Sequence, residues 1–260
     1  MSADAVHGAL LAPLARAERL PWAGGKARGL SMLCRCGFAV PEGIVLQAGR
    51  DGSLPVGLAE FCAAMGGPLI VRSSAMVEDG SDASYAGQFE SVMNLRGFDE
   101  VRAAIVHCKR ATQRAAQYQL ELGTGRASQA VAGEGAMAFV VQRMIEAQCS
   151  GVLFTVDPVT GDGDRMVLEA TAGTGEKLTA GRESAQRYVY AMTGALLEAP
   201  RRQERLLDEE RLAQIFSEAR RAQHALGPAL DLEWALSPSG TLYWLQVRPV
   251  TTQVDADRIR

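Results

Sequence analysis

The chain has 260 residues, 47% of them hydrophobic and 22% charged, with a formal net charge of −3. This balance is typical of a folded globular protein, and no global positive field would hold nucleic acid or an anionic membrane. Residues 1–20 contain no hydrophobic run of signal-peptide length, so we expect a cytoplasmic protein. The five cysteines form no Cys-x-x-Cys pair, which argues against a zinc site and a disulfide framework.

The first half of the chain predicts helices and strands after a loosely amphipathic lead-in over residues 1–20. Two glycines precede a helix over about 26–36, which Gly37 can end, so Lys26 falls in the first helical turn. A polar loop over 75–87, rich in Gly, Ser and Asp, joins two strands and predicts a hairpin with a long tip. The other predicted elements are a strand within 38–47, a short helix over 58–65, strands over 68–74 and 88–95, and a long helix over 98–122.

A polar linker over 124–134 separates two predicted lobes, an amino-terminal lobe over 1–123 and a carboxyl-terminal lobe over 124–260. In the second lobe, short apolar and alternating runs are typical of strands. We predict strands at about 136–144, 150–157, 165–171 and 187–191, a helix over 208–226, and a closing hairpin of 231–236 and 242–248. The fold class is therefore α+β, with largely antiparallel sheets flanked by helices.

Four polar side chains alternate with apolar residues in the closing hairpin. Because side-chain direction has a period of two, Asp231 and Glu233 share one face of their strand, and Gln246 and Arg248 share one face of theirs. If these faces coincide, two carboxylates and an amide oxygen can bind Mg²⁺ with phosphate and water, while the arginine neutralises phosphate. The alternative is a solvated sheet face with a cross-strand pair of Glu and Arg.

Two basic residues are candidates for phosphate binding. All but three of the 27 basic residues are Arg, and Lys26 follows Gly-Gly at a helix N-terminus, which favours anions. The Walker A spacing is missing. Arg72 ends a buried strand and enters the small-residue loop, whose backbone N–H groups could close around phosphate oxygens. Taken singly, these features and the Gly-rich stretch after Glu169 are also compatible with surface ion pairs and exposed turns.

The order of these motifs and their residues, over about 24–251, resemble the amino-terminal ATP-grasp domain of phosphoenolpyruvate synthase, pyruvate phosphate dikinase and rifampin phosphotransferase. The most specific segment is Val71-Arg-Ser-Ser-Ala-Met-Val-Glu-Asp-Gly-Ser-Asp-Ala-Ser-Tyr-Ala-Gly-Gln, which is similar to the family's arginine and phosphate loop. Gly24-Gly-Lys-Ala-Arg-Gly-Leu resembles the family's opening, and Asp231-Leu-Glu-Trp with Leu245-Gln-Val-Arg-Pro resembles its metal and phosphate cluster. The resemblance implies an ATP-grasp fold whose nucleotide site lies between the two lobes.

The resemblance also implies a role for each matching residue. Lys26, Arg72 and Arg248 become catalytic cations, and Lys26 and Arg72 also bind the nucleotide. Glu233 and Gln246 become the Mg²⁺ ligands. The further nucleotide contacts implied are Ser84, Ala86 and Gly87 in the loop, Gln142 and Met144 in the adenine pocket, and Glu169 and Asp231.

By the same resemblance, the family cleaves ATP to AMP and phosphate and passes the β-phosphoryl group to a histidine on a swivelling domain. No segment here resembles the Gly-Gly-x-x-x-His-Ala of that domain, so we expect an ATP-dependent phosphotransferase subunit with a separate histidine-bearing partner protein. The implied cofactors are ATP and Mg²⁺, with no nucleic acid or membrane as partner. The alternatives are a free-standing small-molecule kinase, for which no general base is identified beyond the metal carboxylates, and a catalytically inactive nucleotide-binding module.

Overall fold

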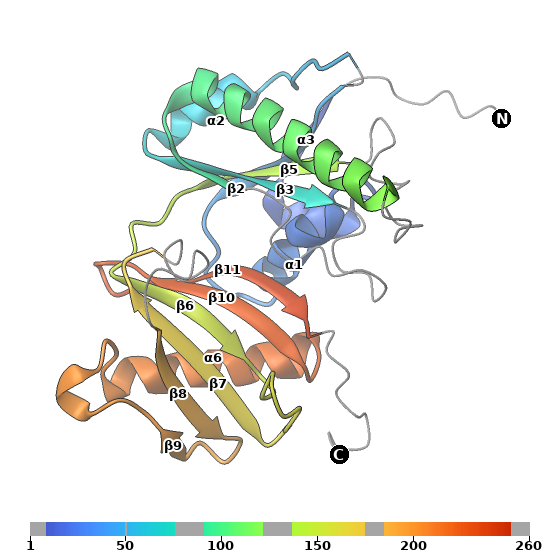
Figure 1. The fold of residues 1–260 in the computed structure, drawn as a ribbon. Coiled ribbons are helices and arrows are strands. Elements are labelled where there is room, and N and C mark those ends of the chain that lie inside the picture. The colour runs from blue at the N-terminus through green and yellow to red at the C-terminus, as the bar shows by residue number, and fades with distance from the viewer. Residues whose placement is uncertain (1–8, 50, 76–90, 122–136, 175–184, 251–260) are drawn as a thin grey trace. The chain divides into compact units, whose positions relative to one another are not determined.

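A computed structural model describes residues 9–49, 51–75, 91–121, 137–174 and 185–250 (Figure 1). For residues 115–121 it describes the backbone alone. The chain divides into two compact units. The first unit consists of Met1–Ser31 and Pro41–Met144, and the second of Met32–Val40 and Ile145–Arg260.

The first unit is built on a five-stranded antiparallel sheet with the strand order β1-β2-β5-β3-β4. Its strands are β1 (Leu10–Pro13), β2 (Gly43–Gln47), β3 (Leu69–Ala75), β4 (Ser91–Leu95) and β5 (Met137–Arg143). Its helical elements are η1 (Leu14–Arg19), α2 (Leu58–Met65) and α3 (Gly97–Glu121), together with the first part of α1 (Gly24–Arg35). The predicted hairpin is confirmed, because β3 and β4 pair with each other.

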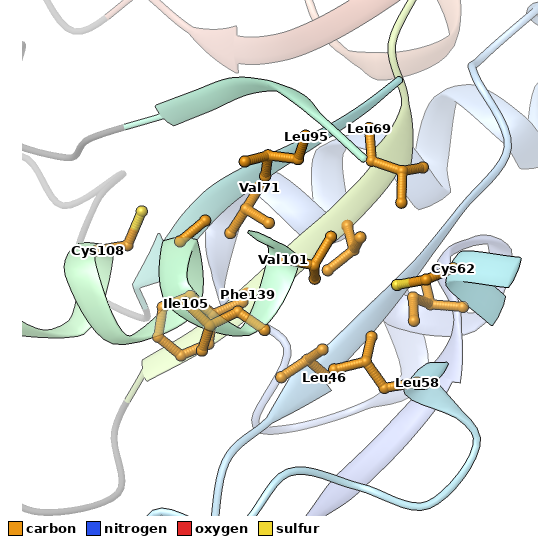
Figure 2. Close-up of a cluster of buried hydrophobic side chains, with 13 residues drawn as sticks. Leu46, Leu58, Cys62, Leu69, Val71, Leu95, Val101, Ile105, Cys108 and Phe139 are labelled. Atoms are coloured by element: carbon orange, nitrogen blue, oxygen red, sulfur yellow. The ribbon is translucent and has the colours of Figure 1, made fainter. Parts of the chain in front are cut away.

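The main core of this unit lies between one face of the sheet and the helices α2 and α3 (Figure 2). Alternate residues of β2, β3 and β5 point to this face, as the period of two requires, and α3 contributes residues at helical spacing. The buried cluster comprises Ile44, Leu46, Leu58, Cys62, Leu69, Val71, Leu95, Val101, Ala104, Ile105, Cys108, Phe139 and Val141. The residues between them on β3, including Arg72 and Ser74, therefore point to the opposite face of the sheet.

The second unit is a six-stranded antiparallel sheet with the order β11-β10-β6-β7-β8-β9 and one long helix, α6 (Figure 1). The strands are β6 (Cys149–Phe154), β7 (Arg165–Ala172), β8 (Gln186–Ala191), β9 (Leu196–Glu198), β10 (Leu230–Leu236) and β11 (Leu242–Pro249). A short 3₁₀ turn, η2 (Arg202–Glu204), precedes α6 (Glu209–Leu226), whose N-cap, Asp208, accepts the N–H of Arg211 at 2.8 Å.

Helix α6 covers one face of this second sheet. The indole Nε1 of Trp244 on β11 donates to Glu218 Oε2 on α6 at 2.7 Å, and Tyr190 on β8 stacks on Phe216 of α6 with 4.8 Å between ring centroids. Trp234 lies directly opposite Trp244 on the neighbouring strand, and both rings are fully buried. These contacts define the face of the sheet that packs against α6, and the strand residues that alternate with the contacting residues point to the opposite face.

A β-bulge interrupts the regular pairing of β10 with β11 in the closing hairpin. Trp234 pairs with Trp244 and Glu233 pairs with Gln246, so Leu245 is an extra residue on β11. In a regular strand, Trp244 and Gln246 would point to the same face because they are two residues apart. The bulge lets Trp244 face α6 while Gln246 lies beside Glu233 on the opposite face.

The predicted α+β class with antiparallel sheets and flanking helices is confirmed. Neither the short strand β1, placed within the amphipathic lead-in, nor β9 was predicted. The units also divide later than the predicted boundary at residue 124, because β5 pairs with β2 and β3 and so belongs to the first sheet. The linker over 124–134 and nearly all of the loop over 75–87 lie outside the described residues.

Among the helices that the structure describes, none combines the length and the apolar character needed to cross a membrane.

Candidate functional site

In the first unit, the structure places the beginning of α1 against the end of β3. The Ala27 N–H donates to Ser74 Oγ at 3.1 Å, and Ser74 Oγ donates to the Ala23 carbonyl at 2.8 Å. Lys26 directly precedes Ala27 in the first turn of α1, as predicted. Arg72 lies two residues before Ser74, on the same face of β3 and with its Cα atom about 7 Å away along the strand. The first turn of α1 and Arg72 thus occupy the same face of the first sheet.

The two residues predicted for an adenine pocket lie at the end of β5 and just after it. Gln142 is 3% exposed, and its Nε2 donates to the Pro41 carbonyl at 2.9 Å. The Met144 sulfur accepts a hydrogen bond from the N–H of Asn94, at 3.4 Å. The side chain of Gln142 therefore holds the segment that leads into β2. This hydrogen bond uses one of the two N–H groups of the Gln142 side-chain amide.

In the second unit, a row of polar residues crosses the sheet on the face opposite α6. Directly opposed positions run from Gln246 to Glu233, then to Val152, Glu169 and Arg187. Two strand spacings separate Glu233 from Glu169, so their Cα atoms lie about 10 Å apart, with Val152 between them. Glu169 was predicted as a nucleotide contact, and this placement puts it on the same face as Glu233.

The neighbouring row contains the ion pair between Asp231 and Arg248. The Arg248 Nε and Nη2 atoms both lie 2.7 Å from Asp231 Oδ2, and Asp231 is 7% exposed. Burial raises the pKa of Asp231 above its ordinary value and Glu233 acts in the same direction, whereas the Arg248 guanidinium opposes the shift. The pair holds Arg248 against β10, beside Glu233.

The predicted coincidence of the two polar faces is confirmed by the strand register. Arg248 lies directly opposite Asp231 and forms an ion pair with it, and Glu233 lies directly opposite Gln246. The Glu233 carboxylate and the Gln246 amide oxygen are hard donors of the kind that Mg²⁺ takes. Within the described ranges, no group of three or more His, Cys, Asp and Glu side chains could hold a metal by itself. By their chemistry, these two donors could hold a Mg²⁺ ion only together with ligands from phosphate and water.

Sequence reasoning missed two residues that shape these surfaces. Ser74 stood in the phosphate-loop motif without a role, although the lack of a capping side chain at Ala23 and Gly24 is a signal that the cap comes from elsewhere. Asp157 was read only as part of a strand, but its Oδ1 accepts the N–H groups of Val159 and Thr160 at 2.9 and 3.1 Å. That bonding is typical of Asp at a turn.

Some sequence candidates remain outside this description or away from these faces. Ser84, Ala86 and Gly87 lie outside the described residues, as does His7. His107 on α3 and His224 on α6 are both exposed. Helix α3 covers the face of the first sheet opposite Arg72, and α6 covers the face of the second sheet opposite Glu233.

Comparison with known proteins identifies the family. Residues 57–199, more than half of the chain, match the family described as "Pyruvate phosphate dikinase, AMP/ATP-binding domain". The chain belongs to this family. This membership agrees with the ATP-grasp fold that the sequence motifs implied.

Three curated relatives show how much of a longer protein the chain represents. It is 30% identical to the prodigiosin synthesizing transferase PigC of Serratia marcescens, over 88% of this chain and 32% of the relative. It is 31% identical to a probable phosphoenolpyruvate synthase of Archaeoglobus fulgidus, over 71% and 27%, and 32% identical to a rifampicin phosphotransferase of a Streptomyces species, over 70% and 23%. The chain thus spans a third or less of the length of these relatives. A solved L-amino acid ligase from Bacillus licheniformis has a TM-score of 0.49 and 16% identity, over 87% of this chain and 43% of that one.

Proposed function

We propose that this chain binds ATP with Mg²⁺ and cleaves it so that a phosphoryl group passes to an acceptor histidine. The observation that carries the proposal is the arrangement of β10 and β11, where Glu233 and Gln246 lie opposite each other beside the Asp231–Arg248 pair. A carboxylate, an amide oxygen and an arginine side by side suit a phosphate-bound Mg²⁺. The relatives named as a rifampicin phosphotransferase and as a probable phosphoenolpyruvate synthase support a transfer of phosphate.

Each residue has a distinct part in this proposal. Phosphoryl transfer needs alignment and charge neutralisation more than covalent chemistry from the protein. Lys26, at the beginning of a helix, and Arg72 would bind phosphate oxygens, and Arg248 would stabilise the charge that develops during transfer. Glu233 and Gln246 would hold Mg²⁺, which screens the phosphate charge when bound. Ser84, Ala86, Gly87, Gln142, Met144, Glu169 and Asp231 would complete the nucleotide contacts.

The acceptor would lie outside the described residues. Within its own unit, each of the helices that carry His107 and His224 covers the sheet face opposite the proposed phosphate and metal ligands. By resemblance to the family, we propose a histidine on a swivelling domain, carried by a separate protein or by another part of a longer chain. ATP, water and the acceptor histidine would then yield AMP, inorganic phosphate and the phosphohistidine.

The test begins with binding. Titration calorimetry with ATP, with and without Mg²⁺, should show tight binding only when the metal is present. Glu233→Gln removes a charged ligand and should weaken Mg²⁺-dependent ATP binding by at least about tenfold, or about 1.4 kcal/mol. Glu210→Gln is the matched control, because Glu210 is an exposed carboxylate in the first turn of α6. Equal affinity of the two variants would overturn the assignment of the metal site.

Product analysis then tests the reaction. Chromatography of the nucleotides after incubation with Mg-ATP, with and without a histidine-bearing swivelling-domain protein, should show AMP and phosphate only when that protein is present. ADP formed without it would favour a free-standing kinase. Binding without turnover in either case would favour a nucleotide-binding module.

A further inference from the structure

The amino-terminal end of α1 has no capping side chain of its own. A helix leaves its first N–H groups without intrahelical partners, and a Ser, Thr, Asp or Asn before the first turn commonly accepts one of them. Here Ala23 and Gly24 precede the turn, and neither side chain can accept a hydrogen bond. The φ angle of Gly24 is +76°, far from the helical value of about −63°, so Gly24 takes the place of the cap residue. Ala27 is then the third residue of the first turn.

Ser74 supplies the missing cap from a different strand. Its Oγ accepts the Ala27 N–H, the donor that a cap residue commonly binds, although the two residues are 47 positions apart in the sequence. The same hydroxyl donates to the Ala23 carbonyl at 2.8 Å. A Cβ atom at Gly24 would lie 2.6 Å from Ser74 Oγ and 2.1 Å from the Ser74 carbonyl oxygen. The Ser74 hydroxyl therefore lies where a local capping side chain would begin.

This cap joins the two cations that were predicted to bind phosphate. β3 is hydrogen-bonded on both sides, to β5 and β4, and it carries Arg72 two residues before Ser74. Lys26 lies next to Ala27, the residue that Ser74 binds. Ser74 is fully buried, so its two hydrogen bonds are shielded from competing water. The bonds fix the first turn of α1 to the strand that holds Arg72.

We propose that Ser74 is a positioning residue for ATP binding, which holds Lys26 at a fixed spacing from Arg72 so that both reach the phosphate groups. This inference rests on the proposed function, in which Lys26 binds ATP. Ser74 itself does not contact the nucleotide in this proposal. It acts by keeping the first turn of α1, and with it Lys26, in place against β3.

Ser73 provides a matched control. It is adjacent on β3 and equally buried, but its side chain points to the opposite face of the sheet, toward the core under α2 and α3. Its Oγ has no hydrogen-bond partner among the described residues. Ser73→Ala removes the same atom as Ser74→Ala without touching α1.

The experiment measures ATP affinity by calorimetry in wild type, Ser74→Ala, Ser73→Ala, Lys26→Ala and the double variant Ser74→Ala/Lys26→Ala. Ser74→Ala should weaken ATP binding about three- to tenfold, the range expected for the loss of a helix-end contact. Ser73→Ala should change it less than about twofold. In the Lys26→Ala background, Ser74→Ala should have no further effect, because a residue that acts through Lys26 has nothing left to position. A merely structural serine would lower affinity equally in both backgrounds.

Amide hydrogen exchange supplies a second measurement that does not depend on ATP. The Ala27 amide should be protected in the wild-type protein and should exchange faster in Ser74→Ala but not in Ser73→Ala. An unprotected Ala27 amide in wild type would overturn the cap, even if Ser74→Ala does not fold. Unchanged ATP affinity in a folded Ser74→Ala would overturn the positioning role while leaving the proposed function intact. Absence of ATP binding by wild type would overturn the proposed function and the positioning role with it.

Discussion

The turn that follows β6 depends on Asp157, and we predict that Asp157→Ala destabilises the second unit by about 3 kcal/mol. Asp157 is 5% exposed, and its Oδ1 accepts the N–H groups of Val159 and Thr160 at 2.9 and 3.1 Å. A hydrogen bond to a charged group contributes about 1.5–3 kcal/mol to stability. We take the lower end of this range for each of the two bonds to Asp157, because Val159 and Thr160 are exposed and water can bind their N–H groups in the variant. The Arg187 Nη2 atom lies 3.8 Å from Asp157 Oδ2 and is partly exposed, so it adds less than about 1 kcal/mol.

Asp157→Asn separates the hydrogen bonds from the charge. The amide keeps an oxygen that can accept both N–H groups, so we expect a loss of only about 1 kcal/mol at pH 7. Burial alone would raise the pKa of Asp157, but the N–H groups of Val159 and Thr160, together with Arg187, lower it below its ordinary value. The charge therefore stabilises the fold above the unfolded-state pKa of about 3.9, and this contribution is lost as the pH falls through the lower folded-state pKa. The difference between wild type and Asp157→Asn should shrink accordingly below about pH 4.

Urea unfolding followed by circular dichroism at pH 7 and at acidic pH measures these differences, with separate transitions fitted if the two units unfold independently. Asp164→Asn is the control, because Asp164 is an exposed carboxyl in the same connection between β6 and β7 and should change stability by less than about 0.5 kcal/mol. The reasoning fails if Asp157→Ala is as stable as this control, or if Asp157→Asn loses as much as Asp157→Ala at pH 7.

Three further predictions use contacts of single residues. Trp244→Phe removes the 2.7 Å hydrogen bond from the indole Nε1 to Glu218, whereas Trp234→Phe removes an indole Nε1 with no partner among the described residues. In urea unfolding, Trp244→Phe should therefore lower the free energy of unfolding by about 1 kcal/mol more than Trp234→Phe. Equal losses of stability in the two variants would contradict this. Gly24→Ala places a Cβ 2.1 Å from the Ser74 carbonyl oxygen, while Gly37, with a similar φ of +75°, has nothing within 4 Å of its Cβ position. Both variants strain the backbone by about 1–2 kcal/mol, and Gly24→Ala should cost at least about 1 kcal/mol more in thermal or urea unfolding. Burial raises the pKa of the Cys149 thiol to about 11, so a thiol reagent at pH 8 should label Cys149 only when urea unfolds the protein. Labelling of Cys149 in the folded protein would contradict this and show that the site opens.

Local sequence signals predicted most helices because their causes lie within a few residues. The helix over 58–65 has the predicted bounds, and α6 begins after Asp208, whose side chain caps it as the Asp-Glu-Glu start of that helix indicates. The long helix α3 carries Val101, Ile105 and Cys108 on its buried face, the spacing that predicted it. The closing hairpin was predicted from two alternating strands joined by a short turn.

Other features depend on contacts between distant parts of the chain, which local patterns do not encode. β1 is a four-residue strand with no strong periodicity, and its pairing with β2 completes it. β5 follows the predicted linker but inserts between β2 and β3, so only strand pairing decides which unit it belongs to. The bulge at Leu245 can likewise be recognised only from the alignment of the two strands. The alternation of side chains in a regular strand would instead place Trp244 and Gln246 on the same face.

The sequence by itself determined the α+β class, the polar faces of the closing hairpin and the place of Lys26 in a first helical turn, since each follows from residue order within one element or hairpin. The tertiary structure decided that Arg248 pairs with Asp231 while Gln246 lies opposite Glu233, and that Ser74 caps the helix of Lys26. Those outcomes depend on strand register and on a hydrogen bond across 47 residues, which are settled only when the chain has packed.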